Sequence, residues 1–272
     1  MNQINDRVLL SFDGECLYRC KHCYTYELPK NEMRSIEEIV ESISNENFDV
    51  VYISQKNENF VDPNVGLDLC ERIFEKYKTH IMLITRRVFN LEQSNRLLEL
   101  HKKMKTNGKI LFVGVSVIGM ESSTISERVD VIPSTSQRLD FAKKVYHMGI
   151  ESLLLVRPLF PHKIIPRTEI EQIIDYVAGQ ISCVLTGALM VNEYILERLG
   201  ISEKDLNYID GGESEYLSGA ISETMKFVDV LEEIKHLKKY CSKRGVPFFE
   251  HSMPALRYLS SLYEEERVAI SV

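Results

Sequence analysis

Three cysteines, Cys16, Cys20 and Cys23, fall within the short stretch SFDGECLYRCKHCYTY (11–26), and no fourth follows at similar spacing. Thiolates bind zinc and iron and carry out redox chemistry, so a group this dense points to one of those uses. The N-terminus has neither the basic head nor the apolar body of a secretory leader, so we expect a cytoplasmic protein. Six cysteines in such a chain argue against a disulfide framework.

Three kinds of site compete for this triplet. Structural zinc normally takes four closed ligands, and here His22 would have to complete the set within a very tight loop. A redox pair formed by Cys20 and Cys23 would leave Cys16 without a role. An iron–sulfur cluster held by three thiolates keeps one iron open for a substrate or cofactor, which explains the missing fourth cysteine.

Short apolar runs rich in β-branched residues alternate with segments of helical period. The predicted strands span 7–14, 48–54, 80–86, 110–117, 151–159 and 182–190. The predicted helices span 35–44, 65–78, 91–105, 134–148 and 167–178. Strands that are apolar along most of their length and separated by helices are typical of a parallel sheet covered on both faces.

This pattern predicts an α/β fold, namely a partial (β/α)6 TIM-like barrel with a short C-terminal helical extension and one extra strand. We expect a single structural domain in which 1–200 form the barrel core and 201–272 pack on it. Within the extension the sequence predicts a loop at 208–219, a long helix at about 220–244 and a strand at 246–252. The cysteine triplet follows the first strand, at the edge where α/β proteins place their chemistry.

The remaining cysteines, Cys70, Cys183 and Cys241, are isolated from one another and from the triplet. Cys70 and Cys241 lie in predicted helices, and Cys183 begins a predicted strand. We expect all three to be buried small hydrophobic residues.

The spacing Cys16-x-x-x-Cys20-x-x-Cys23, followed by the aromatic Tyr24, resembles the signature of the radical S-adenosylmethionine (radical SAM) enzymes. The resemblance implies a catalytic 4Fe–4S cluster whose open iron binds SAM, with Tyr24 near the adenine. It also implies reductive cleavage of SAM to a 5′-deoxyadenosyl radical that abstracts hydrogen from a substrate. An electron donor such as flavodoxin or ferredoxin is the partner that this chemistry requires.

The same family often carries a Gly-Gly-Glu-like stretch after its second strand, which binds the SAM amino group. Here 53–63 reads ISQKNENFVDP, without a glycine, and Ser54 and Glu58 are the nearest counterparts. The alternative is that this stretch is only a polar turn between a strand and a helix.

The segments ITRR (84–87) and VGVSV (113–117) resemble the spore photoproduct lyase-like branch of the family. The resemblance implies that Arg86 contacts the SAM carboxylate and that Ser116 contacts the SAM ribose or carboxylate. A cation suits a carboxylate in such a contact. The alternatives are a surface charge for Arg86 and a satisfied core hydroxyl for Ser116.

The order of residues in 127–161 resembles the same branch, and we expect Glu127 and Arg138 to pair near the SAM site. A structural salt bridge is the alternative. Ser134 or Ser136 is expected to cap the following helix. The chain has Glu127-Arg128 where the branch has Glu-Pro, and it has no clear counterpart of the lyase's additional catalytic cysteine, so photoproduct repair does not follow from the resemblance.

The charge and hydropathy of the chain limit its partners. The net charge is −7, which weighs against tight binding to nucleic acid, and no apolar run is long enough to cross a membrane. The substrate stays unidentified and could be a small molecule, a peptide or a nucleotide. Residues expected near the barrel mouth are Arg157, Thr186, Leu189, Glu250 and His251.

Two further functions remain open besides a radical SAM enzyme of unknown substrate. One is an iron–sulfur protein that transfers electrons or senses redox state without cleaving SAM. The other, within the enzyme class, is a lyase that repairs nucleic acid.

Overall fold

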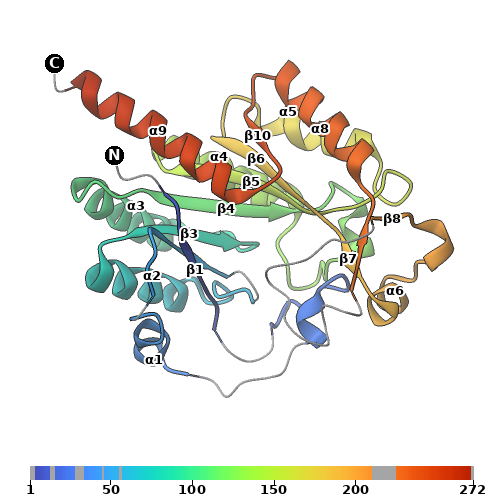
Figure 1. Ribbon diagram of the computed structural model, residues 1–272, viewed down its shortest axis with the longest axis horizontal. Coiled ribbons are helices and arrows are strands. Elements are labelled where there is room, and N and C mark those ends of the chain that lie inside the picture. The colour runs from blue at the N-terminus through green and yellow to red at the C-terminus, as the bar shows by residue number, and fades with distance from the viewer. Residues whose placement is uncertain are drawn as a thin grey trace.

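Parallel strands buried on both faces form the centre of the molecule (Figure 1). The computed structural model describes residues 4–12, 16–27, 34–44, 46–54, 57–209 and 225–270. Within these ranges the main sheet has seven parallel strands in the order β1-β2-β3-β4-β5-β6-β10. They are β1 (Arg7–Leu10), β2 (Val50–Ile53), β3 (His80–Thr85), β4 (Leu111–Val117), β5 (Glu151–Leu159), β6 (Cys183–Ala188) and β10 (Phe248–Phe249).

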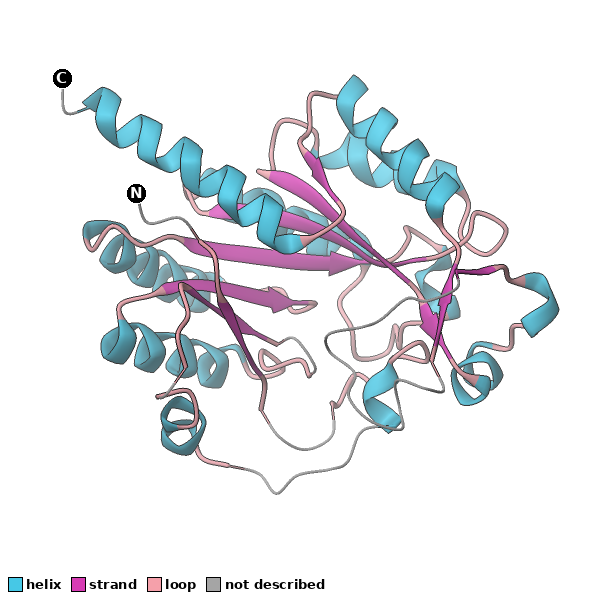
Figure 2. Cartoon of the chain, viewed as in Figure 1, coloured by secondary structure: helices cyan, strands magenta, loops and turns pink. Residues whose placement is uncertain are grey.

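The outer face of this sheet is covered by helices that follow the strands along the chain (Figure 2). They are α1 (Ile36–Glu41), α2 (Pro63–Tyr77), α3 (Leu91–Thr106), α4 (Thr135–His147), α5 (Arg167–Val177) and α8 (Leu231–Lys243). Strand β2 shows how the alternation of side chains divides the core, because Val51 and Ile53 point to this face while Val50 and Tyr52 point to the other.

Local capping contacts fix where these helices begin. Ser35, Asn90 and Ser134 each form a capping box with the residue three positions later. At α2 the side chain of Asp62 caps the helix, and Pro63 occupies its first turn. The helix predicted at 134–148 therefore begins after Ser134, not after Ser136.

The inner face of the sheet is covered by one helix, α9 (Ser252–Ile270), which crosses in front of the strands in Figure 1. Ala255, Leu256 and Leu259 of α9 pack against inner-face side chains of β2 to β6. Arg257 Nε donates to the carbonyl oxygen of Ile4 at 2.7 Å, which ties the helix to the chain just before β1. The C-terminal extension thus fills part of the space that the curved sheet encloses.

A small antiparallel sheet lies beyond the end of β6. It joins β7 (Met190–Val191), β9 (Lys226–Val228) and β8 (Tyr208–Ile209), and α6 (Glu193–Leu199) lies between β7 and β8 in the chain. The long helix predicted at 220–244 is wrong in its described first part, because Lys226–Val228 is a strand and the helix begins at Leu231. Of the predicted loop, Tyr208–Ile209 form β8, and 210–219 lie outside the described residues.

The predicted fold class is confirmed. Each predicted strand of the core appears within a few residues of its expected bounds, and β5 has the bounds that the sequence predicted. The sheet is not closed into a full barrel, and β10 supplies the extra strand, parallel to β6. No helix in the described ranges is long and apolar enough to span a membrane.

The three isolated cysteines are buried, as predicted. Cys70, Cys183 and Cys241 are each 0% exposed and contribute to the hydrophobic cores.

Replacing Leu256 by alanine tests the packing of α9 on the inner face. Leu256 is 0% exposed, so we expect a loss of about 2–5 kcal/mol in the free energy of unfolding, measured in urea. The matched control is Leu262→Ala on the same helix, where the leucine is 40% exposed and the loss should stay below about 1 kcal/mol. Equal losses in the two variants would show that α9 does not pack as described.

Candidate functional site

The three cysteines lie on one loop after β1, and all three touch the same small apolar group. This group contains Tyr18, Ile132 and Val61. Cys20 is 6% exposed, and Cys16 and Cys23 are half-buried. Two turns shape the loop, since the Arg19 amide donates to the Cys16 carbonyl oxygen at 3.3 Å and the Cys23 amide donates to the Cys20 carbonyl oxygen at 3.0 Å.

Contacts from two distant segments hold this loop. The Lys21 amide donates to the carbonyl oxygen of Ser126 at 2.8 Å, and His22 Nδ1 contacts the Ser126 hydroxyl. Arg198 of α6 donates from Nε to the Lys21 carbonyl oxygen at 3.1 Å and from Nη2 to the Cys23 carbonyl oxygen at 2.9 Å. Residues far along the chain therefore fix the middle of the cysteine loop.

The donor set suits a thiolate-ligated centre in its chemistry. None of the three cysteines is in a disulfide, and a metal would bind them as thiolates. Burial raises the pKa of Cys20 to about 12, which the nearby Arg86 cation opposes. In the described ranges, no group of three or more His, Cys, Asp or Glu side chains is arranged so that it could hold a metal ion.

Two predicted SAM-binding residues, Ser54 and Glu58, shape the turn after β2. Ser54 adopts a φ of 72°, and its hydroxyl accepts from the Asn59 amide at 2.9 Å. Glu58 accepts from the Thr85 hydroxyl at 2.8 Å and from the Arg86 amide at 2.7 Å. Burial raises the pKa of Glu58, and these hydrogen bonds oppose the rise. Glu58 therefore joins the turn after β2 to the end of β3.

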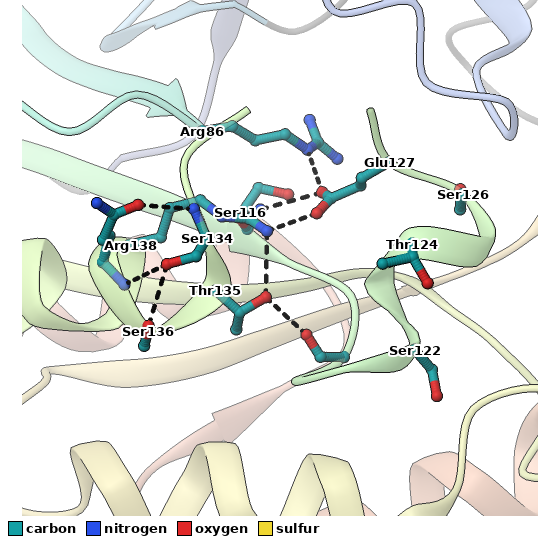
Figure 3. A network of polar contacts seen from close by, with 12 residues as sticks. Arg86, Ser116, Ser122, Thr124, Ser126, Glu127, Ser134, Thr135, Ser136 and Arg138 are labelled. Atoms are coloured by element: carbon teal, nitrogen blue, oxygen red, sulfur yellow. Dashed lines mark hydrogen bonds and ion pairs between the residues drawn. The ribbon is translucent and has the colours of Figure 1, made fainter. Parts of the chain in front are cut away.

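The carboxylate of Glu127 accepts hydrogen bonds from two arginines, as Figure 3 shows. Arg86 Nε donates to Glu127 Oε1 at 2.9 Å, and Arg138 Nη1 donates to the same oxygen at 3.0 Å. Arg138 Nη2 donates to Glu127 Oε2, and its Nη1 also donates to the carbonyl oxygen of Ser116 at 2.6 Å. The predicted pairing of Glu127 with Arg138 is confirmed.

Burial distinguishes the roles of the two arginines. The side chains of Glu127 and Arg138 are each 1% exposed, whereas the Arg86 side chain is 19% exposed. Burial alone would raise the pKa of Glu127, but the charges of Arg138 and Arg86 outweigh it and lower that pKa. Arg86 is thus the most exposed of the three side chains.

Arg157, at the end of β5, adjoins this network. Its carbonyl oxygen accepts from Arg86 Nη2 and from the Ser116 hydroxyl, both at 3.4 Å. Its Nε donates to the Thr186 carbonyl oxygen at 2.8 Å. A side chain at Gly187 would place its Cβ 3.1 Å from that nitrogen, so glycine leaves room for Arg157 against β6.

The structure brings together most of the residues that the sequence singled out. Glu58, Arg86, Ser116, Glu127 and Arg138 form one connected network beside the cysteine loop. Tyr24 begins a short helix right after the loop, half-buried against the main core. Whether these residues bind SAM stays a prediction.

The other residues expected near the barrel mouth differ in their exposure. Thr186 and Leu189 are buried, and Thr186 donates from its hydroxyl to the Val156 carbonyl oxygen at 3.1 Å. Glu250 and His251 are exposed just before α9.

Sequence reasoning missed the residues that hold the cysteine loop. Ser126 and Arg198 contact it directly, and Asn59 accepts from the Phe12 amide at 3.1 Å just before it. The adjacent Asn57 donates to the Phe12 carbonyl oxygen at 2.8 Å. The two asparagines of the NEN stretch were the available signal, because polar side chains after a strand often bind neighbouring backbone.

Comparison with solved structures identifies similar folds at low sequence identity. A mutant of spore photoproduct lyase superposes with a TM-score of 0.62 at 15% identity, over 88% of this chain and 75% of the lyase. The chain has the fold of spore photoproduct lyase. A lyase mutant with S-adenosylmethionine and dinucleoside spore photoproduct bound gives a TM-score of 0.61 at 14% identity, over 89% and 76% of the two chains.

A second similar fold is that of SuiB from Streptococcus suis, bound to its precursor peptide SuiA. It superposes with a TM-score of 0.56 at 12% identity, over 92% of this chain and 49% of SuiB, so the chain spans about half of SuiB. Spore photoproduct lyase and SuiB are both radical SAM enzymes, which confirms the resemblance at the level of the fold. Comparisons of the sequence with family models and with curated proteins find no match.

Glu127→Gln tests the buried network through its pH dependence. The pKa of Glu127 is lowered in the folded protein, so its charge stabilises the fold above its ordinary value of 4.5, and that contribution is lost as the pH falls through the folded pKa. We expect the variant to lose about 3–5 kcal/mol at pH 7, because the buried Arg138 and the partly exposed Arg86 lose their counter-ion. The difference from the native protein should shrink as the pH falls below 4.5.

Urea unfolding over a pH series measures both the loss of stability at pH 7 and its decrease at low pH. The control is Glu99→Gln, which removes an exposed partner of Lys102 and should cost at most about 1 kcal/mol. A stability difference for Glu127→Gln that stays constant over the whole pH range would contradict the buried, charged state of Glu127.

Proposed function

We propose that this chain is a radical SAM enzyme that acts on a substrate not yet identified. The observation that carries the proposal is the Cys16–Cys20–Cys23 loop, placed directly after the first strand of a sheet with the fold of spore photoproduct lyase. In this proposal the three thiolates hold a 4Fe–4S cluster, and the absence of a fourth nearby cysteine leaves one iron for SAM. When bound, this pair supplies a 5′-deoxyadenosyl radical that abstracts hydrogen from the substrate.

The residues of the buried network orient SAM in this proposal. Arg86 binds the SAM carboxylate, because its side chain is the partly exposed member of the network and a guanidinium pairs well with a carboxylate. Glu127 holds the Arg86 side chain at Nε, and Glu58 holds its backbone amide. Arg138 positions Glu127 from the buried side.

Ser116 and Tyr24 complete the SAM site in this proposal. The Ser116 hydroxyl donates to the Arg157 carbonyl oxygen beside Arg86 at 3.4 Å. In this proposal the hydroxyl binds the SAM ribose or carboxylate in place of that carbonyl oxygen. Tyr24 directly follows the cysteine loop and stands near the adenine. In this proposal Ser54 and Glu58 contact the SAM amino group.

The substrate class stays open between a small molecule, a peptide and a nucleotide. Spore photoproduct lyase has been solved with a dinucleoside lesion and SuiB with a precursor peptide, so this fold accommodates both kinds of ligand in those proteins. The net charge of −7 disfavours tight binding to duplex nucleic acid in this chain.

In this proposal the electron for SAM cleavage comes from a donor protein such as flavodoxin or ferredoxin.

Anaerobic reconstitution with iron and sulfide, followed by reduction with dithionite and addition of SAM, tests the proposal. We expect 5′-deoxyadenosine from the native chain, and loss of product in Cys16→Ala, Cys20→Ala and Cys23→Ala. The matched control is Cys70→Ala, in which a buried cysteine outside the loop is replaced and product formation should remain. Iron and sulfide bound without 5′-deoxyadenosine would support an iron–sulfur redox or sensing protein instead, and one retained zinc per chain would contradict both functions.

Arg86→Met tests the assignment of the SAM carboxylate contact. A hydrogen bond to a charged group is worth about 1.5–3 kcal/mol, so SAM affinity should fall about 10- to 100-fold, measured by equilibrium binding to the reconstituted protein. Arg86→Lys should lose less, because it keeps the charge and loses the fork of donors. Unchanged SAM affinity in Arg86→Met, with the cluster content of the native protein, would overturn the assignment.

A further inference from the structure

Arg198 of α6 makes two hydrogen bonds to the cysteine loop, and no motif in the sequence predicts them. Arg198 donates from Nε to the Lys21 carbonyl oxygen at 3.1 Å and from Nη2 to the Cys23 carbonyl oxygen at 2.9 Å. The same guanidinium lies over the Tyr26 ring, with its central carbon 4.6 Å from the ring centre. A planar guanidinium with donors in a fixed fork is well suited to bind two carbonyl oxygens at once.

Helix α6 gives this arginine a fixed position. Ile195, Leu196 and Leu199 are buried and fasten the helix to the main core. The Asn192 side chain accepts from the Ile195 amide at 3.0 Å and caps the start of the helix. The helix ends at Gly200, whose φ of 67° is a left-handed conformation that glycine adopts without strain.

The contact also places a positive charge next to the cysteine loop. A cluster gains negative charge when it accepts an electron, so a nearby cation stabilises the reduced form. Hydrogen bonds and net charge around the sulfur ligands set the potentials of iron–sulfur clusters. Arg198 is thus placed to act both on the shape of the loop and on the potential of whatever the loop binds.

We propose that Arg198 is a positioning residue that fixes the Lys21–Cys23 backbone, and that it raises the reduction potential of a cluster bound by this loop. The second half of this statement rests on the proposed function, whereas the first half concerns the chain without its cluster. Two measurements separate them.

Hydrogen exchange of the metal-free protein, followed residue by residue by NMR, tests the positioning role. The Lys21 amide donates to the Ser126 carbonyl oxygen and the Cys23 amide donates to the Cys20 carbonyl oxygen, so both should be protected. In Arg198→Met we expect both amides to exchange about tenfold faster or more, because each lost hydrogen bond to a charged donor is worth about 1.5–3 kcal/mol. Exchange at the native rate would overturn the positioning role.

The matched control is Arg244→Met, which removes an arginine just after α8 that pairs with Asp175 of α5 at 2.7 Å. It should leave the exchange of Lys21 and Cys23 unchanged. Thermal unfolding followed by circular dichroism confirms that each variant is folded before its exchange rates are compared.

A redox titration of the reconstituted protein with dithionite, followed by electron paramagnetic resonance, tests the effect of charge. The midpoint potential should be lower in Arg198→Met than in the native protein and close to the native value in Arg198→Lys, which keeps the cation. Equal potentials in the native protein and Arg198→Met would overturn this half of the proposal. If the native chain binds no cluster, the proposed function and the effect on the potential both fail, while hydrogen exchange still decides the positioning role.

Discussion

The buried carboxylate of Glu127 is the interaction on which the geometry of the site depends. Arg86 reaches it from the end of β3 and Arg138 reaches it from α4, so one ion-pair network joins three segments of the chain. A charge buried without its partner costs several kcal/mol, which makes the network a strict constraint on their relative positions. Ser126, which precedes Glu127, binds the cysteine loop, so the Glu127 network also fixes the position of that loop.

In this network the arginine that supports Glu127 from the buried side differs from the arginine that is partly exposed. Arg138 is buried and turned toward Glu127 and the Ser116 carbonyl oxygen, whereas Arg86 keeps part of its side chain exposed. Residues held by such supporting hydrogen bonds lose little freedom when a ligand binds, which favours affinity and accurate placement. The cysteine loop is supported in the same way, because Ser126 and Arg198 hold its backbone while none of its thiols is in a disulfide.

The sequence predicted the strands of the core well because strands buried on both faces read as continuous apolar runs, as in β5. The cysteine triplet was found from its spacing, and the Glu127–Arg138 pair was found from its resemblance to a family. Lys226–Val228 was mistaken for helix because the strong helical period of Leu231–Lys243 was extended toward the N-terminus, while the partners of this strand lie far away in the chain. Arg198 gave no local signal, since the carbonyl oxygens it binds belong to residues 175 and 177 positions earlier.

The central claim is that three thiolates of one loop hold a cluster with an iron left open for SAM. Electron paramagnetic resonance of the reconstituted, reduced protein tests it most directly, with spectra recorded before and after addition of SAM. The account predicts the signal of a reduced 4Fe–4S cluster and a change in its g values when SAM binds. A signal that SAM leaves unchanged, at concentrations that saturate a reconstituted radical SAM enzyme of the same fold, would contradict the claim.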